Sequence, residues 1–175
     1  TLYADAVVVA SGAWSGGLLQ SLGLAIPVQP VRGQTVLLTD LPLPMRHIVV
    51  SPIGYLVPHA DGTLLLGATR EQAGFDFRAT AEGFAHLLHT LSRLSPRLMH
   101  ATLAGHTVGL RPGTPDSNPL IGTLERWKGL YLATGHAYHG ILLAPATAIA
   151  IADLITKGFT DLPIHPFEPN RFVRG

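Results

Sequence analysis

The chain of 175 residues contains no cysteine. This absence excludes a disulfide scaffold, a thiolate metal site and a cysteine nucleophile, and it is compatible with a reducing cytosol, so we expect a cytoplasmic protein. An excess of one charge is also missing, since 12 basic and 11 acidic residues give a net charge of +1. A balance this close to neutral excludes a strong electrostatic footprint for nucleic acid.

Long apolar runs are lacking too, because no stretch reaches the roughly 18 uninterrupted apolar residues that a membrane span needs. The nearest candidate, Gly140 to Ile155, contains Pro145, Thr147 and Asp153. It predicts a buried helix rather than a membrane-spanning one. The chain has no initiator Met and opens close to a strand-like run, which indicates a piece of a larger protein.

Local patterns predict a mixture of strands and helices. The Val-rich run near the start is typical of a strand buried on both faces, and Asp61-Gly62 predicts a hairpin turn. Thr80 is an expected N-cap for a helix that Ser95-Pro96 ends. In chain order, the predicted strands are 4–10, 28–39 with an interruption at 32–34, 54–58, 64–69, 102–110 and 129–133, and the predicted helices are 17–22, 80–94 and 141–156.

The order of these elements predicts two substructures. Strand and helix occur at both ends of the chain, and the middle is rich in strands. This pattern indicates an α/β protein in which one part is built from both ends and a second part is inserted between them.

Arg111 is the residue whose surroundings point most directly to chemistry. It lies between apolar residues and Pro112, and the proline favours an extended backbone at Arg111. A guanidinium in such a place serves either as a buried ion-pair partner or as a clamp that holds a carboxylate by two parallel hydrogen bonds. The sequence alone leaves both readings open.

Histidine pairs raise a metal hypothesis, but neither pair has a third ligand at an informative spacing, so we expect no metal site. His86 and His89 lie on the amphipathic helix, and His136 and His139 lie in a loop bounded by Gly135 and Gly140. That loop opens into a helix whose N-terminal amides favour an anionic or electron-rich ligand. Ser11 lacks the frame of a nucleophile elbow.

Four segments together resemble the C-terminal half of the flavin amine oxidoreductases, and most closely the glycine oxidase branch that serves the thiamine pathway. D-amino-acid oxidase and sarcosine oxidase are relatives in that family. The segments that carry the resemblance, in order, are Val7 to Ser15, Gly54 to Pro58, Gly109 to Asp116, and Ala133 to His136 with Gly140 to Pro145. Their order and spacing extend over nearly the whole chain.

The resemblance implies a Rossmann-like FAD-binding domain, of which this chain holds the C-terminal part, and an inserted substrate domain with a mixed sheet. Residues 1–27 and 105–160 correspond to the FAD-binding part, 28–104 to the substrate-binding part, and 161–175 to an extended tail. The sequence lacks the N-terminal half that binds the nucleotide in this family. We therefore expect this missing half of the same protein to be a partner of the chain. The family also implies a homo-oligomer.

The resemblance also assigns residues to the site. Arg111 matches the arginine that binds the substrate carboxylate, Tyr55 the tyrosine whose hydroxyl assists it, and Tyr138 stands where glycine oxidases often carry a second arginine. Substrate binding then falls to Arg111, Tyr55 and the Tyr138 hydroxyl. The departure puts glycine, as against sarcosine or another small amino acid, in question. The residues that match cofactor-contacting positions are Ala10, Ser11, Gly12, Trp14, Gly135, His136, Ala137, Tyr138, His139, Gly140, Ile141 and Leu142.

The implied reaction is transfer of a hydride from the substrate α-carbon to non-covalently bound FAD. The imine then hydrolyses to a 2-oxo acid and ammonia, and oxygen reoxidises the flavin to give hydrogen peroxide. Two alternatives remain open at this point. The protein is a related dehydrogenase with another electron acceptor, or the isolated chain is an inactive fragment because it lacks the nucleotide-binding half.

Overall fold

The computed structural model describes residues 1 and 3–173 and separates into two compact units. The first is Thr1–Val31 together with Arg111–Gly175, and the second is Arg32–Leu110. The predicted α/β class with an inserted unit is confirmed. Which unit serves the flavin and which the substrate stays a prediction.

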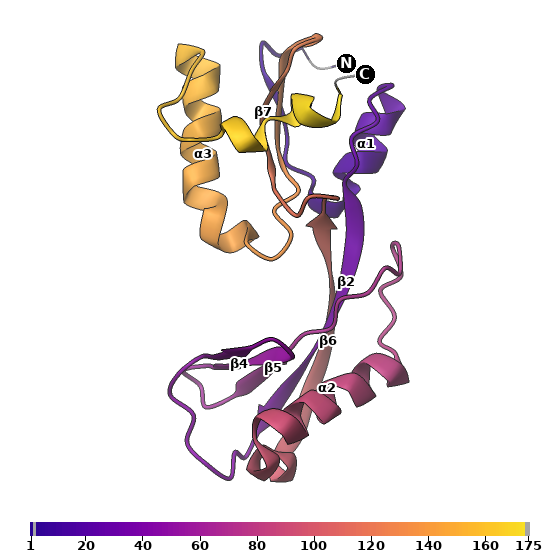
Figure 1. Ribbon diagram of the computed structural model, residues 1–175, viewed down its shortest axis with the longest axis vertical. Coiled ribbons are helices and arrows are strands. Elements are labelled where there is room, and N and C mark those ends of the chain that lie inside the picture. The colour runs from indigo at the N-terminus through magenta and orange to yellow at the C-terminus, as the bar shows by residue number, and fades with distance from the viewer. Residues whose placement is uncertain (2, 174–175) are drawn as a thin grey trace. The chain divides into compact units, whose positions relative to one another are not determined.

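The first unit is a three-stranded sheet with a helix on each side (Figure 1). Strand order is β1 (Val7–Val9), β8 (Trp127–Thr134), β7 (Leu120–Leu124). β1 pairs with β8 in parallel, and β7 pairs with β8 antiparallel. This sheet therefore combines parallel and antiparallel pairs. The sequence predicts the mixed sheet in the inserted part instead.

Alternation along β7 and β8 gives this sheet two apolar faces. Leu120, Leu130 and Leu132 pack with Leu19 of α1 (Ser15–Ser21). Their neighbours Ile121 and Tyr131 pack instead with α3 (Gly140–Lys157). Because successive strand residues point to opposite faces, one strand supplies both cores.

Helix α3 is buried on one side only. Its buried residues are Thr147, Ala150 and Ile151, and Gly158 ends it in the left-handed conformation with φ +81°. Ile141 is 95 % exposed and Ile149 is 56 % exposed. The expected buried helix is therefore buried only in part within the described chain. Its length and apolar composition would allow a membrane span, which for a single helix is a weak indication.

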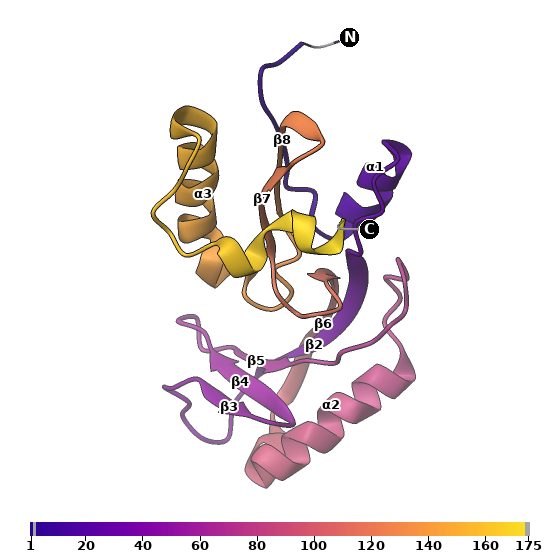
Figure 2. The same cartoon turned by 45° about the horizontal axis from the view of Figure 1, so that its top comes forward.

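The second unit is a five-stranded sheet with one helix against one face (Figure 2). The strand order is β3 (Val49–Ser51), β4 (Gly54–Pro58), β5 (Leu64–Gly67), β2 (Gln29–Thr39) and β6 (Thr102–Gly113). Pairs β3–β4, β4–β5 and β2–β5 are antiparallel. The buried core residues are Val36, Leu38, Leu56, Leu64, Leu66, Leu87, Leu91 and Leu98, of which Leu87 and Leu91 come from α2 (Ala81–Leu94).

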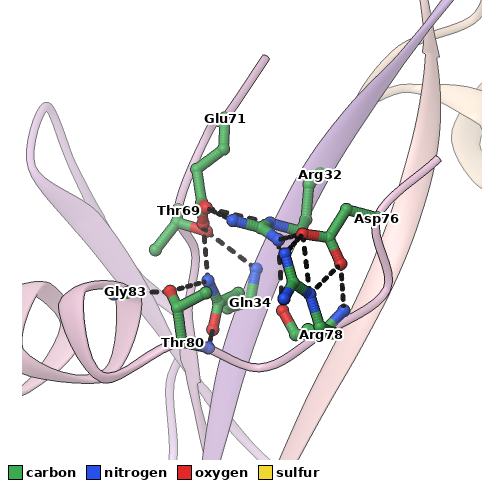
Figure 3. Close-up of polar contacts among 8 residues, drawn as sticks. All are labelled: Arg32, Gln34, Thr69, Glu71, Asp76, Arg78, Thr80 and Gly83. Atoms are coloured by element: carbon green, nitrogen blue, oxygen red, sulfur yellow. Dashed lines mark hydrogen bonds and ion pairs between the residues drawn. The ribbon is translucent and has the colours of Figure 1, made fainter. Parts of the chain in front are cut away.

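Strand β2 runs without the interruption predicted at residues 32–34. The prediction was wrong because the polar side chains there are satisfied by distant partners. Arg32 bonds Glu71 through Nε at 2.9 Å and Nη2 at 2.5 Å, and Gln34 Nε2 donates to Thr80 Oγ1 at 2.9 Å (Figure 3). A buried polar residue is tolerated in a strand when its hydrogen bonds are made.

The tail is not extended throughout, since residues His165–Phe167 and Pro169–Phe172 form 3-10 turns. Arg171 holds it, because its Nε donates to Asp116 Oδ2 at 2.8 Å. The hydrogen bond from Arg171 lowers the pKa of Asp116 to about 2. Two short strands, β3 and β7, were also not predicted, since neither carries a clear alternating pattern.

The N-cap residue Thr80 allows the N-terminal boundary of α2 to be tested. Its side chain accepts hydrogen bonds from Gly83 N at 3.1 Å and from Gln34 Nε2. Thr80→Ala is expected to lower the free energy of unfolding by about 1–2 kcal/mol, measured by urea denaturation. Thr80→Ser keeps the acceptor and should retain most of the stability. Equal losses in both variants would contradict the capping role.

Candidate functional site

The candidate site begins where β1 and β8 end side by side. Their parallel register pairs Val9 with Leu132, so both strands deliver their following residues to the same edge of the sheet. β1 leads to Ser11 and Gly12, and β8 leads to Gly135 and His136. In α/β sheets, ligands bind in the crevice outside the carboxyl ends of parallel strands.

A chain of hydroxyl groups fastens the two strand ends together. Thr134 Oγ1 donates to the Gly12 carbonyl at 3.1 Å, so it accepts the 2.7 Å bond from Ser15 Oγ. Ser15 Oγ lies 3.1 Å from Ser11 Oγ. Ser15 and Thr134 are buried, and sequence reasoning missed both because their partners are more than a hundred residues apart.

The loop after β8 takes a shape that its sequence permits. Gly135 has φ +75°, and Ala137 has φ +45°, an uncommon conformation for a residue with a side chain. The Ala137 amide donates to the Pro112 carbonyl at 2.9 Å, next to Arg111. The bond therefore fixes the loop against the end of β6.

Helix α3 starts directly from this loop. Among the described residues, no side chain caps its first turn, and the turn carries no acidic residue. The first helical bond is that of the Leu143 amide to the His139 carbonyl. The amides of Gly140, Ile141 and Leu142 precede it, and such N-terminal groups favour negative charge.

An apolar hollow of about 480 Å³ lies between this helix and the strands. Its lining residues are Val8, Ala10, Ala133, His136, Gly140, Ala144, Thr147, Ala148, Ile151, Ala152 and Ile155. Hollows lined mainly by apolar groups with a few polar ones are typical of small-molecule and cofactor sites.

His136 stands at the polar end of the hollow. Its Nε2 lies 3.0 Å from Thr147 Oγ1. Desolvation by burial lowers the pKa of His136, so the ring is neutral at pH 7. His139 and Tyr138, by contrast, are exposed. No group of three or more metal-ligating side chains gathers within residues 1 and 3–173.

Arg111 and Tyr138 lie together in the first unit. The Arg111 Cζ atom is 5.1 Å from the centroid of the Tyr138 ring, within the range of a cation–π interaction. Arg111 is half-buried and lies near the end of β6, within the strand, which restricts its backbone. The choice between an ion-pair partner and a carboxylate clamp, left open by the sequence, stays a prediction.

Tyr55 belongs to the second unit, where it lies on β4. The structure therefore brings together Ser11, Gly12, residues 135–142 and Arg111 within one unit, and it describes Tyr55 separately. Trp14 follows Gly12 in the turn before α1 and is 52 % exposed. Each of these roles remains a prediction.

The pKa of His136 has a consequence for stability. Because the folded state disfavours the charged ring, stability is fully present above the pKa of the unfolded histidine, about 6.5, and is lost as the pH falls toward the lower folded value. His136→Gln should flatten this part of the acid dependence in urea denaturation. His86→Gln, at an exposed site on α2, serves as the control. An unchanged acid dependence in His136→Gln would contradict the assignment.

Comparison with known proteins gives consistent matches. The family described as DAO, FAD dependent oxidoreductase, matches residues 1–154. Glycine oxidase from Pseudomonas putida is 40 % identical over 168 residues, which are 96 % of this chain and 46 % of that protein. The bifunctional protein ThiO/ThiG of Synechocystis is 41 % identical over 97 % of this chain and 26 % of its own length.

A solved structure agrees with these matches. The crystal structure of glycine oxidase from Geobacillus kaustophilus superposes with a TM-score of 0.89 at 38 % identity, over 96 % of this chain and 46 % of that one. The chain thus spans about half the length of the glycine oxidases that it matches. It belongs to the family of FAD dependent oxidoreductases, whose cofactor is FAD.

Proposed function

We propose that the whole protein oxidises glycine or another small amino acid with FAD, and that this chain supplies its substrate-binding residues and part of its flavin site. The observation that carries the proposal is Arg111, half-buried beside the Tyr138 ring and joined through the Pro112–Ala137 hydrogen bond to the loop that opens α3. This arrangement supports the proposal, because a guanidinium suited to carboxylates lies near the start of a helix whose N-terminus favours electron-rich ligands.

The residues of the first unit fit a flavin. The hollow offers apolar contact, and the amides of residues 140–142 offer donors for a carbonyl edge whose negative charge grows on reduction. A Cβ on Gly12 would meet no atom within 4 Å, so the backbone there is open to close approach. We propose that Ala10, Ser11, Gly12 and Trp14 flank the cofactor and that residues 135–142 lie against its ring system.

When bound, FAD supplies the acceptor for the hydride that leaves the substrate α-carbon. The chain's own share is orientation. We assign to Arg111 the two parallel hydrogen bonds to the substrate carboxylate, assisted by the Tyr55 hydroxyl, while the Tyr138 ring restricts the guanidinium. Loss of the hydride, which is two electrons and one proton, from the neutral amine leaves an iminium ion, and water converts that ion to a 2-oxo acid and ammonium.

The other half of the protein is the proposed partner of this chain. Strand β1 lies at the edge of its sheet with Val7 52 % exposed, and α3 exposes Ile141, Leu142 and Ile149. Exposed large apolar side chains on two elements of one unit indicate an interaction site. We propose that the nucleotide-binding half covers it, that the isolated chain is inactive, and that the whole protein is a cytoplasmic homo-oligomer serving thiamine biosynthesis.

Replacing Arg111 tests its proposed role in binding the substrate carboxylate. In the full-length protein, Arg111→Ala should raise KM for glycine steeply while FAD stays bound, with a loss in kcat/KM of about 2–4 kcal/mol. Arg126→Ala, at an exposed turn of the same unit, is the matched control. Steady-state kinetics and the visible flavin spectrum measure both quantities. An unchanged KM in Arg111→Ala would reject the assignment.

Charging the outer face of α3 tests the partner. Ile149→Asp should reduce the FAD that copurifies with the full-length protein, because a carboxylate would have to be buried against the other half. Thr156→Asp, at an exposed polar position of the same helix, should retain FAD. Equal FAD content in both variants would show that this face stays uncovered.

The electron acceptor is tested with the same full-length protein. Oxygen as acceptor predicts one hydrogen peroxide for each amino acid oxidised under air. Oxidation that requires an added quinone or dye, without peroxide, would instead establish the dehydrogenase alternative.

A further inference from the structure

The face of the second sheet that points away from α2 carries Tyr55. Its neighbour Leu56 packs in the core with α2, so alternation directs Tyr55 to the opposite face. Across the ladder Tyr55 pairs with Gly67, and a Cβ on Gly67 would overlap the Tyr55 ring. The ring therefore lies over a position that has no side chain.

The strand that contains Gly67 has one extra residue just beyond it. Gly67 lies opposite Thr35, but Glu71 lies opposite Arg32 in an antiparallel bridge. Four steps on one strand thus match three on the other. The Thr69 amide donates to the Gln34 carbonyl at 3.2 Å, which locates the extra residue between Gly67 and Thr69. This is a β-bulge, a feature that redirects the side chains following it.

The bulge reverses which face the next residues reach. Without it, Glu71 would share the face of Gly67 and Tyr55. Instead its carboxylate accepts hydrogen bonds from Arg32 and from Gln34 Nε2 at 2.8 Å (Figure 3). Gln34 also bonds Thr80 at the start of α2, so this whole cluster lies on the α2 side.

Glu71 is held firmly in this orientation. Desolvation acts to raise the pKa of Glu71, but hydrogen bonds from Thr69, Arg32 and Gln34 outweigh it and lower the pKa. The carboxylate is therefore charged at pH 7 and pairs with the buried Arg32. A fully bonded cluster of this kind fixes the backbone of the residues next to it.

The side chain of Arg70 lies on the face of the sheet opposite to that of Glu71. As the direct neighbour of Glu71 it points away from α2, to the side of Tyr55. The register places it opposite Gly33, which has no side chain to fill the space. Arg70 is exposed and lies three positions beyond Gly67, at most about 10 Å along the strand.

From this geometry we infer that Arg70 is a specificity-determining residue that recognises a second anionic group on the substrate. The inference rests on the proposed function, in which Tyr55 contacts a small amino acid. Arg70 brings a permanent positive charge with several donors to the same face as the Tyr55 hydroxyl. The favoured substrates are then amino acids whose side chain or nitrogen substituent ends in a carboxylate.

Aspartate and asparagine form a suitable pair of probes, because they have nearly the same shape and differ in the charge of the side chain. With FAD-loaded full-length protein and both enantiomers of each, kcat/KM for the better aspartate enantiomer should exceed that for asparagine about tenfold or more. Arg70→Gln should remove about tenfold of this preference and change the value for glycine less than about threefold. Arg70→Lys should keep part of it.

Arg93→Gln is the matched control, since Arg93 is an exposed arginine near the end of α2, on the other side of the sheet. It should leave the preference unchanged. A wild-type protein without preference for aspartate, or an Arg70→Gln variant that keeps the preference, would overturn the inference.

A binding measurement separates this inference from the proposed function. If none of the amino acids reduces the flavin, the proposed function fails. Calorimetric titration with succinate and with its monoamide then decides the role of Arg70. Binding of succinate about tenfold tighter, lost in Arg70→Gln, supports recognition of the second carboxylate, and equal binding of both compounds overturns it.

Discussion

The parallel pairing of β1 with β8 is the constraint on which the candidate site depends. Parallel strands cannot be joined by a tight turn, so the chain must leave the sheet after β1 and return before β8. The whole second unit occupies that excursion. The pairing also brings the residues after both strands to one edge, where the Ser15–Thr134 hydrogen bond fastens them. Without the parallel pairing, nothing along the chain would bring Gly12 close to Gly135.

A second constraint operates inside the inserted unit. The ion pair between Arg32 and Glu71, with Gln34 and Thr80, joins β2, the segment after β5 and the start of α2. Removing Glu71 would leave the buried Arg32 guanidinium with Asp76 as its ion-pair partner and would break the bonds that join the three elements, which is expected to be destabilising. The same cluster keeps the bulge in place and so determines the face that Arg70 reaches. In our inference, the polar contacts on the α2 side of the sheet thereby determine which residue can recognise a ligand on the other side.

Local signals in the sequence were enough to predict part of this structure. The limits of α2 follow from Thr80 and from Ser95-Pro96, which act within one turn of the helix, and the hairpin follows from Asp61-Gly62. The continuity of β2 could not be predicted in this way, because Arg32 is satisfied by a residue 39 positions away. The bulge is equally invisible in the sequence, since only the pairing register reveals it.

The candidate site shows the same division. Arg111 and the glycine-bounded loop could be singled out from their neighbours along the chain, and the resemblance supplied their roles. The contact of Arg111 with Tyr138 and the buried Ser15 and Thr134 required the fold, because their partners are remote in sequence. The exposure of α3 could not be predicted from the sequence either. An apolar composition indicates that a helix is buried, but it does not show which part of the protein covers the helix.

The central claim is that this chain forms the substrate side of an FAD-dependent amino-acid oxidase. Anaerobic addition of small amino acids, glycine first, to the purified full-length flavoprotein tests it most directly. The account predicts bleaching of the visible flavin absorbance, with one 2-oxo acid and one ammonia formed for each flavin reduced. A flavin spectrum that no small amino acid changes, but that a chemical reductant bleaches fully, would contradict it.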